Sequence, residues 1–384
     1  MTDLPILYGM PGSLYTGKVR SYFRKQRIDY VERAVGMPEF RETVVPAIGR
    51  WIIPVVKLPG GHLVQDGSAI IDHFEGLGPT RFPALPPAGV QRVVALLFEL
   101  FGGEGLLRPA MHYRWNFDDD NEAFRARDFA GALLPLASPA EQAEQIALSS
   151  KRMRRAAQIF GVNPDSAPAI EASYLDFLAR FDAHLAHSPY LLGGRPTIGD
   201  YGLIAALYAH LARDPHPAAL MKACGWRVWR WTERMNAPDH DAGEYGDFSE
   251  ALFADDSIPD SLAAVLAYVA EDYLPEIIAM TAFTNDWLAA NPVTTGALAT
   301  VKPNVRVLGE TSFDWRGQRL TVGVFPYRLY LLQRILDAAD ALDAGARARL
   351  DALFARTGLT PLLACRPVRR VERDNNLEVW GDAQ

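Results

Sequence analysis

The sequence predicts an α+β fold, in which a mixed four-stranded sheet with helices on its faces is followed by helical domains. Strand and helix patterns alternate within residues 1–82, which is typical of strands joined by crossover helices. Four prolines between Pro79 and Pro87 then mark a domain boundary. Helical periodicity dominates after this boundary. We therefore expect a helical domain at 88–240 and a mostly helical C-terminal extension at 241–384.

The N-terminal domain is expected to run strand, helix, strand, helix, strand, strand, helix. A strand–helix–strand order favours parallel neighbours, because the helix carries the chain back across the sheet. Pro59-Gly60-Gly61 is hairpin-turn chemistry and predicts an antiparallel pair. The expected elements are Leu4–Tyr8, Tyr15–Gln26, Asp29–Val35, Pro38–Val45, Trp51–Val56, His62–Val64 and Ser68–Glu75.

The rest of the chain reads mainly as helix. Helices are expected at about 89–101, 121–134, 139–160, 167–187, 200–213 and 217–235. In the extension, a long helix is expected from Asp260 to Asn291 with an interruption at Pro275, because proline removes a backbone donor. One hairpin is expected there, with residues 304–308 facing residues 318–322.

Composition excludes several classes of protein. The net charge of −7 gives no basic footprint, so we expect no nucleic-acid partner. No apolar run approaches the ~20 residues of a membrane span. Residues 1–5 lack a basic start and a signal-type core, so a cytoplasmic location and no membrane partner are expected. Cys224 and Cys365 are too far apart in sequence for a zinc or redox pattern, and no metal is expected.

Two segments together predict a pocket for a small peptide. Proline is normally excluded from central strands, but Pro54 lies inside the strand pattern Ile53–Val56. The bond before Pro54 is a candidate for the rare cis form, which would turn the backbone of Ile53 outward to pair with an extended ligand. A helix start after Gln65-Asp66 offers free N–H groups that suit a carboxylate.

These segments, in this order, resemble the glutathione transferase superfamily. The resemblance implies a thioredoxin-like N-terminal domain and an all-helical glutathione-transferase C-terminal domain over residues 4–235, and the short members lack the remaining extension. Thr197 and Asp200 would form a capping box within the last matching segment. The matching segments are Tyr8–Ser13, Trp51–Val56, Gln65–Ile71 and Pro189–Asp200.

The resemblance implies that glutathione is a co-substrate and that a hydroxyl near the first helix stabilises its thiolate. Alignment on Val19-Arg20 places Ser13 at the position of the catalytic serine in serine-type members. Tyr15 falls where other members keep a cysteine, and Tyr8 lies close to the tyrosine of a third type. The alternative is that Ser13 is a plain helix cap and that both tyrosines are half-buried edge aromatics.

The resemblance also implies the contacts to glutathione. The backbone of Ile53 would pair with the peptide, Asp66 would face the γ-glutamyl amine, and Ser68 or the N–H of Gly67 would face its carboxylate. Gly67 departs from the usual serine, which removes one hydroxyl contact. The alternative is an ordinary helix start, with Arg50 as a surface arginine. The implied set is Arg50, Ile53, Pro54, Asp66, Gly67 and Ser68.

Three functions fit these residues. The first is a serine-type transferase that conjugates glutathione to small hydrophobic electrophiles, with residues of the helical domain as an apolar pocket. The second is a non-catalytic scaffold with the same fold, and the third is a glutathione-dependent isomerase or lyase. In each case the resemblance implies a homodimer. The pocket candidates, which otherwise belong to the core, are Phe98, Phe101, Met111, Tyr113 and Trp115.

Overall fold

The N-terminal sheet has the mixed four-stranded arrangement that the sequence predicts. In the computed structural model, which describes residues 4–384, the strand order is β2-β1-β3-β4. β1 runs parallel to β2 and antiparallel to β3, and β4 is antiparallel to β3. Residues 1–3 of the N-terminal segment, from which we expect a cytoplasmic location, lie outside the described residues. The strands are β1 (Ile6–Gly9), β2 (Val31–Ala34), β3 (Val55–Lys57) and β4 (Leu63–Gln65).

Helices cover both faces of this sheet because side chains alternate along its strands. Leu7 of β1 packs into a cluster with residues of α1 and α3, whereas the neighbouring Tyr8 packs on the opposite face with Phe40 and Ile48. The helices are α1 (Leu14–Gln26), a π-helical turn (Phe40–Val44), α2 (Val45–Ile48) and α3 (Gly67–Gly76).

The second domain is helical, as expected, with two differences. The predicted helix 217–235 is two helices, because Gly225 has a non-helical conformation between them. A further helix, α5, occupies a region left unassigned by the sequence. The helices are α4 (Val90–Leu100), α5 (Leu107–Trp115), α6 (Asp118–Leu133), α7 (Pro139–Ala157), α8 (Ala167–His184), α9 (Ile198–Ala206), α10 (Pro215–Cys224) and α11 (Trp226–Asn236). The π-helical turns Phe101–Gly105 and Leu207–Ala212 follow α4 and α9.

The capping box expected at the start of α9 is confirmed. The side chain of Asp200 accepts hydrogen bonds from the backbone N–H and the hydroxyl of Thr197, both near 3 Å. Asp200 also accepts from the backbone N–H of Leu191 and from the indole of Trp231. This carboxylate therefore fixes the helix start against the preceding signature segment.

The extension is mostly helical and breaks before Pro275, as predicted. The predicted strand 318–322 is confirmed within β6 (Gln318–Val324), but its partner is β5 (Gly309–Trp315), so the predicted strand 304–308 is wrong. A second hairpin, β7 (Arg369–Asp374) and β8 (Leu377–Ala383), was not expected. The helices are α12 (Asp260–Asp272), α13 (Leu274–Ala290), α14 (Pro326–Asp340) and α15 (Ala344–Thr357), and short 3-10 turns lie at Gln158–Phe160, Gly243–Tyr245, Ala254–Asp256 and Thr360–Ala364.

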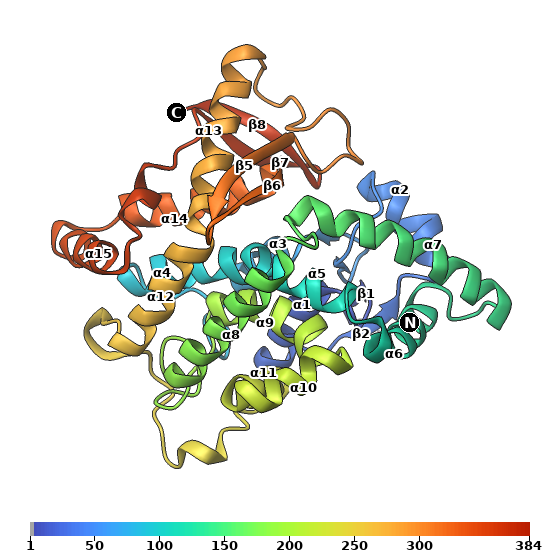
Figure 1. The fold of residues 1–384 in the computed structure, drawn as a ribbon, viewed down its shortest axis with the longest axis horizontal. Coiled ribbons are helices and arrows are strands. Elements are labelled where there is room, and N and C mark those ends of the chain that lie inside the picture. The colour runs from blue at the N-terminus through green and yellow to red at the C-terminus, as the bar shows by residue number, and fades with distance from the viewer. Residues whose placement is uncertain (1–3) are drawn as a thin grey trace.

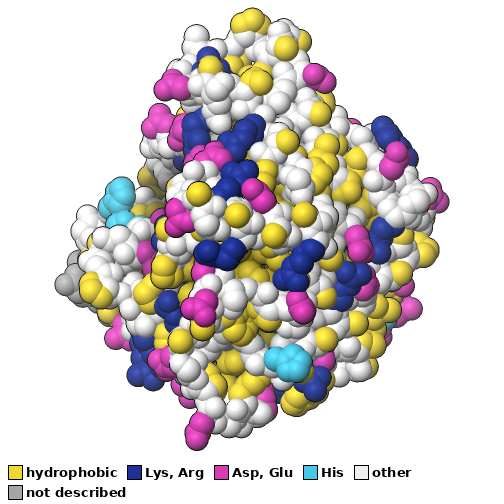
Figure 2. Space-filling model, turned by 90° about the vertical axis from the view of Figure 1, so that its left-hand side faces the viewer, with side chains coloured by type: hydrophobic (Ala, Val, Ile, Leu, Met, Phe, Trp, Pro, Cys, Tyr) yellow, Lys and Arg dark blue, Asp and Glu magenta, His cyan; other side chains and the backbone are white. Residues whose placement is uncertain are grey.

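The extension packs directly on the other two domains. Figure 1 shows its orange and red elements above α4 and close to α3. One hydrophobic cluster reaches from Leu7 of the sheet through α4 to Trp380 of β8. On the face shown in Figure 2, basic and acidic side chains are interspersed. Within residues 4–384, no helix is both long and apolar enough to cross a membrane.

Candidate functional site

The peptide-binding edge that the sequence predicts lies just before β3. The bond between Ile53 and Pro54 is cis. The backbone N–H and C=O of Ile53 form no hydrogen bond within the part of the chain that the structure describes. The backbone groups with which an extended ligand would pair are therefore unused by the fold.

The carboxylate of Asp66 occupies the start of α3. It accepts hydrogen bonds from the backbone N–H of Ser68 at 2.9 Å and of Ala69 at 3.1 Å. The N–H of Gly67, which the resemblance implies as a contact to the ligand carboxylate, has no acceptor among residues 4–384. The backbone φ of Asp66 is 91°, in a region that residues other than glycine rarely adopt. In this conformation the side chain of Asp66 lies against the first turn of α3. The carboxylate of Asp66 thus uses two of the free N–H groups at this helix start and leaves that of Gly67 open.

A cation from the extension pairs with the same carboxylate. Nη1 of Arg373, on β7, lies 3.2 Å from Oδ1 of Asp66, and both side chains are about nine-tenths buried. Burial opposes ionisation of Asp66, but the charges of Arg373 and Lys18 hold its pKa below the ordinary value. Asp66 is therefore a charged internal partner of the extension, and the sequence analysis did not predict this pairing.

The hydroxyl of Ser68 is also engaged internally. Nζ of Lys18 donates to the hydroxyl of Ser68 at 2.8 Å, and that hydroxyl donates to Glu99 at 2.6 Å. The hydroxyl of Tyr327, from α14, lies 3.3 Å from Ser68. A Cβ on residue 67 would lie 3.2 Å from Cδ of Lys18, so a serine there requires the lysine to shift. A side chain at position 67 would therefore lie against the methylenes of Lys18.

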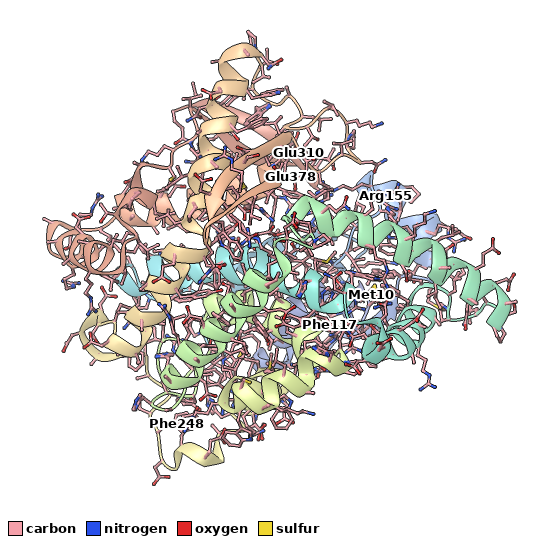
Figure 3. All side chains as sticks on the ribbon, in the orientation of Figure 1. Met10, Phe117, Arg155, Phe248, Glu310 and Glu378 are labelled. Atoms are coloured by element: carbon pink, nitrogen blue, oxygen red, sulfur yellow. The ribbon has the colours of Figure 1, made fainter. Side chains whose placement is uncertain are left out.

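Arg50 is held by the tip of the β7–β8 hairpin. It donates two hydrogen bonds to the carboxylate of Glu378, at 2.9 and 3.1 Å, and one to the backbone C=O of Asn376 at 2.7 Å. Glu378 is labelled on β8 in Figure 3. Arg373 also donates to Gln65, which precedes Asp66. The hairpin tip therefore contacts both ends of the predicted tripeptide site.

The three hydroxyl candidates lie in different surroundings. Ser13 is the N-cap of α1, where its oxygen accepts from the backbone N–H of Thr16 at 3.3 Å. Its own proton has no acceptor among residues 4–384. Tyr8 is fully buried on the other face of the sheet, and burial raises the pKa of its phenol. Only Ser13 and Tyr15 therefore lie near the start of α1.

Tyr15 is tied into a buried ionic network. Its hydroxyl donates to Glu104 at 2.7 Å, and the other oxygen of Glu104 accepts from Arg328 of α14 at 2.9 Å. Arg328 also pairs with Glu276 of α13, which pairs with Arg108 of α5. Burial, followed by the charge of Glu104, raises the pKa of Tyr15 well above its ordinary value. Tyr15 is thus a neutral donor whose proton is already engaged.

The apolar pocket expected for a second substrate is filled by the extension. Met111 and Trp115 are buried in one cluster with Met10, and that cluster includes Phe313 and Trp315 of the β5–β6 hairpin. Met10 is labelled at the centre of Figure 3. The other candidates, Phe98, Phe101 and Tyr113, belong to the main hydrophobic core.

Sequence reasoning missed the residues that fill the site. Two signals were available: Asn375-Asn376 favours a two-residue hairpin turn, and glycine at position 67 indicates a close neighbour. Within residues 4–384, no group of three or more metal-ligating side chains is suited to hold a metal ion. The missed residues are Lys18, Glu99, Glu104, Tyr327, Arg328, Arg373 and Glu378.

The fold and this geometry agree with comparisons to known families. Residues 7–82 match the glutathione S-transferase N-terminal domain, and residues 164–234 match the glutathione S-transferase C-terminal domain. The chain therefore carries both domains of a glutathione S-transferase, followed by about 150 further residues. None of the curated proteins matches the sequence.

Several solved structures are similar in fold. Glutathione transferase GSTFuA3 from Phanerochaete chrysosporium is 18% identical with a TM-score of 0.44, covering 62% of this chain and 98% of its own. The β-etherase LigF from Sphingobium is 15% identical with a TM-score of 0.43, covering 62% and 97%. Glutaredoxin 2 from Salmonella typhimurium, solved with glutathione, is 14% identical with a TM-score of 0.39, covering 63% and 99%.

Proposed function

We propose that this chain is a non-conjugating binding protein built on the glutathione-transferase fold. In the proposal, the C-terminal extension takes the place of glutathione. The Asp66 carboxylate replaces the carboxylate of a ligand at the start of α3, and Arg373 replaces the ligand amine that would face Asp66. The β5–β6 hairpin replaces a hydrophobic second substrate.

The observation that carries the proposal is the set of bonds around Asp66. Its carboxylate accepts from Ser68 and Ala69 and pairs with Arg373. A ligand carboxylate would have to displace this buried charge, and removing a charge from its partners is costly. The proposal therefore predicts weak glutathione binding, which the departure at Gly67 also favours.

The test is a calorimetric titration of the full chain with millimolar glutathione, together with a conjugation assay using 1-chloro-2,4-dinitrobenzene. We expect no saturable binding and no enzyme-dependent conjugation. Micromolar affinity for glutathione, or conjugation above the uncatalysed rate, would overturn the proposal. A glutathione transferase from the same family that conjugates the electrophile serves as the positive control.

One observation favours a second function, a serine-type glutathione transferase. Ser13 caps α1 with a free hydroxyl proton, and the backbone of Ile53 is open. A glutathione thiolate at this point could accept a hydrogen bond from Ser13 and be stabilised by the N-terminal dipole of α1. If conjugation occurs, Ser13→Ala should lower kcat by at least about tenfold, as loss of one thiolate donor. Unchanged conjugation in Ser13→Ala would exclude this role.

Two further expectations stay proposals. Division into domains at 1–82, 88–240 and 241–384 is one, and pairing of two chains is the other. α14 packs against α4 and, through Arg334 and Asp72, reaches α3. A homodimer would therefore have to use surfaces other than the covered sides of α3 and α4, and sedimentation measures whether it forms.

A further inference from the structure

A cleft of about 630 Å³ lies beside the predicted tripeptide site and is not filled by the extension. We call it the Trp51 cleft. Its walls come from residues between Val45 and Ile52, from Arg152 of α7, and from the loop between Pro303 and Arg306. This volume lies within the usual range of small-molecule sites, roughly 300–1,000 Å³. Figure 1 shows α2, α7 and the orange loop before β5 near one another in this region.

The charge of the Trp51 cleft is positive. Three arginines line it, and no acidic side chain does among the residues described. Arg50 is neutralised by Glu378, on which the charge of Arg306 also acts, and neither Arg152 nor Arg306 has an ion pair of its own within residues 4–384. Arg155, one turn along α7 from Arg152 and labelled in Figure 3, also has no such partner within that range. Guanidinium groups without an ion pair in one cleft favour an oxyanion, which they bind with charge-assisted hydrogen bonds.

Arg50 carries one buried donor that the fold leaves unused. Arg50 is only 6% exposed, and its Nε is buried with no acceptor among the described residues. Its other two nitrogens are used by Glu378 and Asn376. Buried polar groups normally find a partner, so this Nε marks a place for a bound water rather than a contact of the cleft.

The aromatic wall of the Trp51 cleft is held in place. Trp51 is 50% exposed, which is unusual for so large an apolar side chain. Its ring packs edge-on against Phe40, with centroids 5.0 Å apart and an interplanar angle of 90°. Pro303 and Ile52 add apolar surface to the cleft. A fixed indole can stack on a planar group with little loss of side-chain freedom.

We propose that the Trp51 cleft binds a small aromatic acid, whose carboxylate lies between Arg152 and Arg306 and whose ring stacks on Trp51. Fixed aromatic surface selects the planar body, and the unpaired guanidinium groups select the charged head. The site is formed jointly by the N-terminal domain, α7 and the extension. It does not rest on the proposed function, because it uses neither Asp66 nor Ser13.

The test is a calorimetric titration with 2-naphthoate, using the uncharged 2-naphthamide as its matched control. We expect saturable binding of the acid, with the amide at least about tenfold weaker, since a hydrogen bond to a charged group is worth about 1.5–3 kcal/mol. Higher salt should weaken binding of the acid but not of the amide, because exposed charges are screened by salt. No saturable binding of 2-naphthoate, or equal binding of acid and amide, would overturn the proposal.

Variants locate the site. The double variant Arg152→Gln/Arg306→Gln should bind 2-naphthoate at least about tenfold more weakly than the wild type. Trp51→Leu keeps an apolar side chain against Phe40. Its affinity for 2-naphthoate should fall by about three- to tenfold, because ring stacking is lost. Arg127→Gln, at an exposed arginine outside the Trp51 cleft, should leave binding unchanged. Equal weakening by the Arg127 variant, or unchanged binding in both cleft variants, would place the acid elsewhere.

Discussion

The contact between Arg373 and Asp66 is the point at which the extension can be released from the predicted tripeptide site. The perturbation is Arg373→Ala, which removes the cation but leaves the β7–β8 backbone intact. Arg373 lies 3.2 Å from Asp66 and also donates to Gln65 and to the backbone of Asn376. Its loss should weaken closure of the hairpin tip over α3.

The expected magnitude follows from burial. Removing one partner of a buried ion pair typically costs about 3–5 kcal/mol. Asp66 keeps two backbone N–H donors and the charge of Lys18, so we expect a cost below that range, of about 2–3 kcal/mol. This corresponds to about a 30- to 140-fold larger population with the tip open. The apparent affinity for any ligand that needs the open state should rise by the same factor.

The assay compares glutathione affinity in the wild type, in Arg373→Ala and in a control variant. Arg370→Ala is the matched control, because Arg370 lies on the same strand but pairs with Asp337 at an exposed position. Such a surface pair contributes about 0–1 kcal/mol. We expect measurable glutathione binding only in Arg373→Ala, with faster hydrogen exchange at the backbone N–H of Ser68 and Ala69.

One result would refute this reasoning. If hydrogen exchange shows that the tip of β7–β8 has opened in Arg373→Ala, yet glutathione still does not bind, the hairpin is not what excludes it. Equal gains of affinity in the Arg370 and Arg373 variants would refute it as well, because only Arg373 contacts Asp66.

Two further predictions concern buried charges, and a third concerns position 67. Arg328→Met leaves Glu104 and Glu276 without their shared cation and should cost about 3–5 kcal/mol in thermal or urea unfolding. Burial and then Arg234 lower the pKa of Lys25 to about 7, below its value in the unfolded chain. The unfolded chain therefore binds more protons above pH 7, so stability should rise towards pH 9 by up to about 1.4 kcal/mol per pH unit, and Lys25→Met should remove this rise. Gly67→Ser should leave glutathione affinity unchanged, as measured by calorimetry, because Asp66 still holds the start of α3.

Each of these predictions has a contradicting outcome. Unaltered stability in Arg328→Met would mean that the network does not join the extension to the second domain. A pH profile of Lys25→Met parallel to that of the wild type would remove Lys25 as its cause. Tight glutathione binding in Gly67→Ser would show that the missing hydroxyl, and not the extension, limits the site.

The N-terminal domain could be predicted from the sequence because its signals are local. Strand and helix periods, the Gly60-Gly61 turn and the Ile53-Pro54 pair each act over a few residues. The first strand of the β5–β6 hairpin was misplaced because the alternation at residues 304–308 resembled a strand. The register is set instead by Arg316-Gly317, where both residues have positive φ and join two seven-residue strands in a tight turn.

The candidate site could be predicted only in part, for a different reason. The sequence identifies Asp66 and Arg50 as polar groups near a helix start and a strand. It does not reveal that Arg373 and Glu378, more than three hundred residues away along the chain, neutralise them. Such pairings depend on how the extension packs against α3 and α4, which no local pattern specifies.

The most direct test of the central claim is a crystal structure of the wild-type chain grown with millimolar glutathione. We predict that Arg373 will still pair with Asp66, that Glu378 will still pair with Arg50, and that no tripeptide will lie along Ile53. Electron density for glutathione along Ile53, with its amine facing Asp66 and the hairpin tip displaced, would contradict the account.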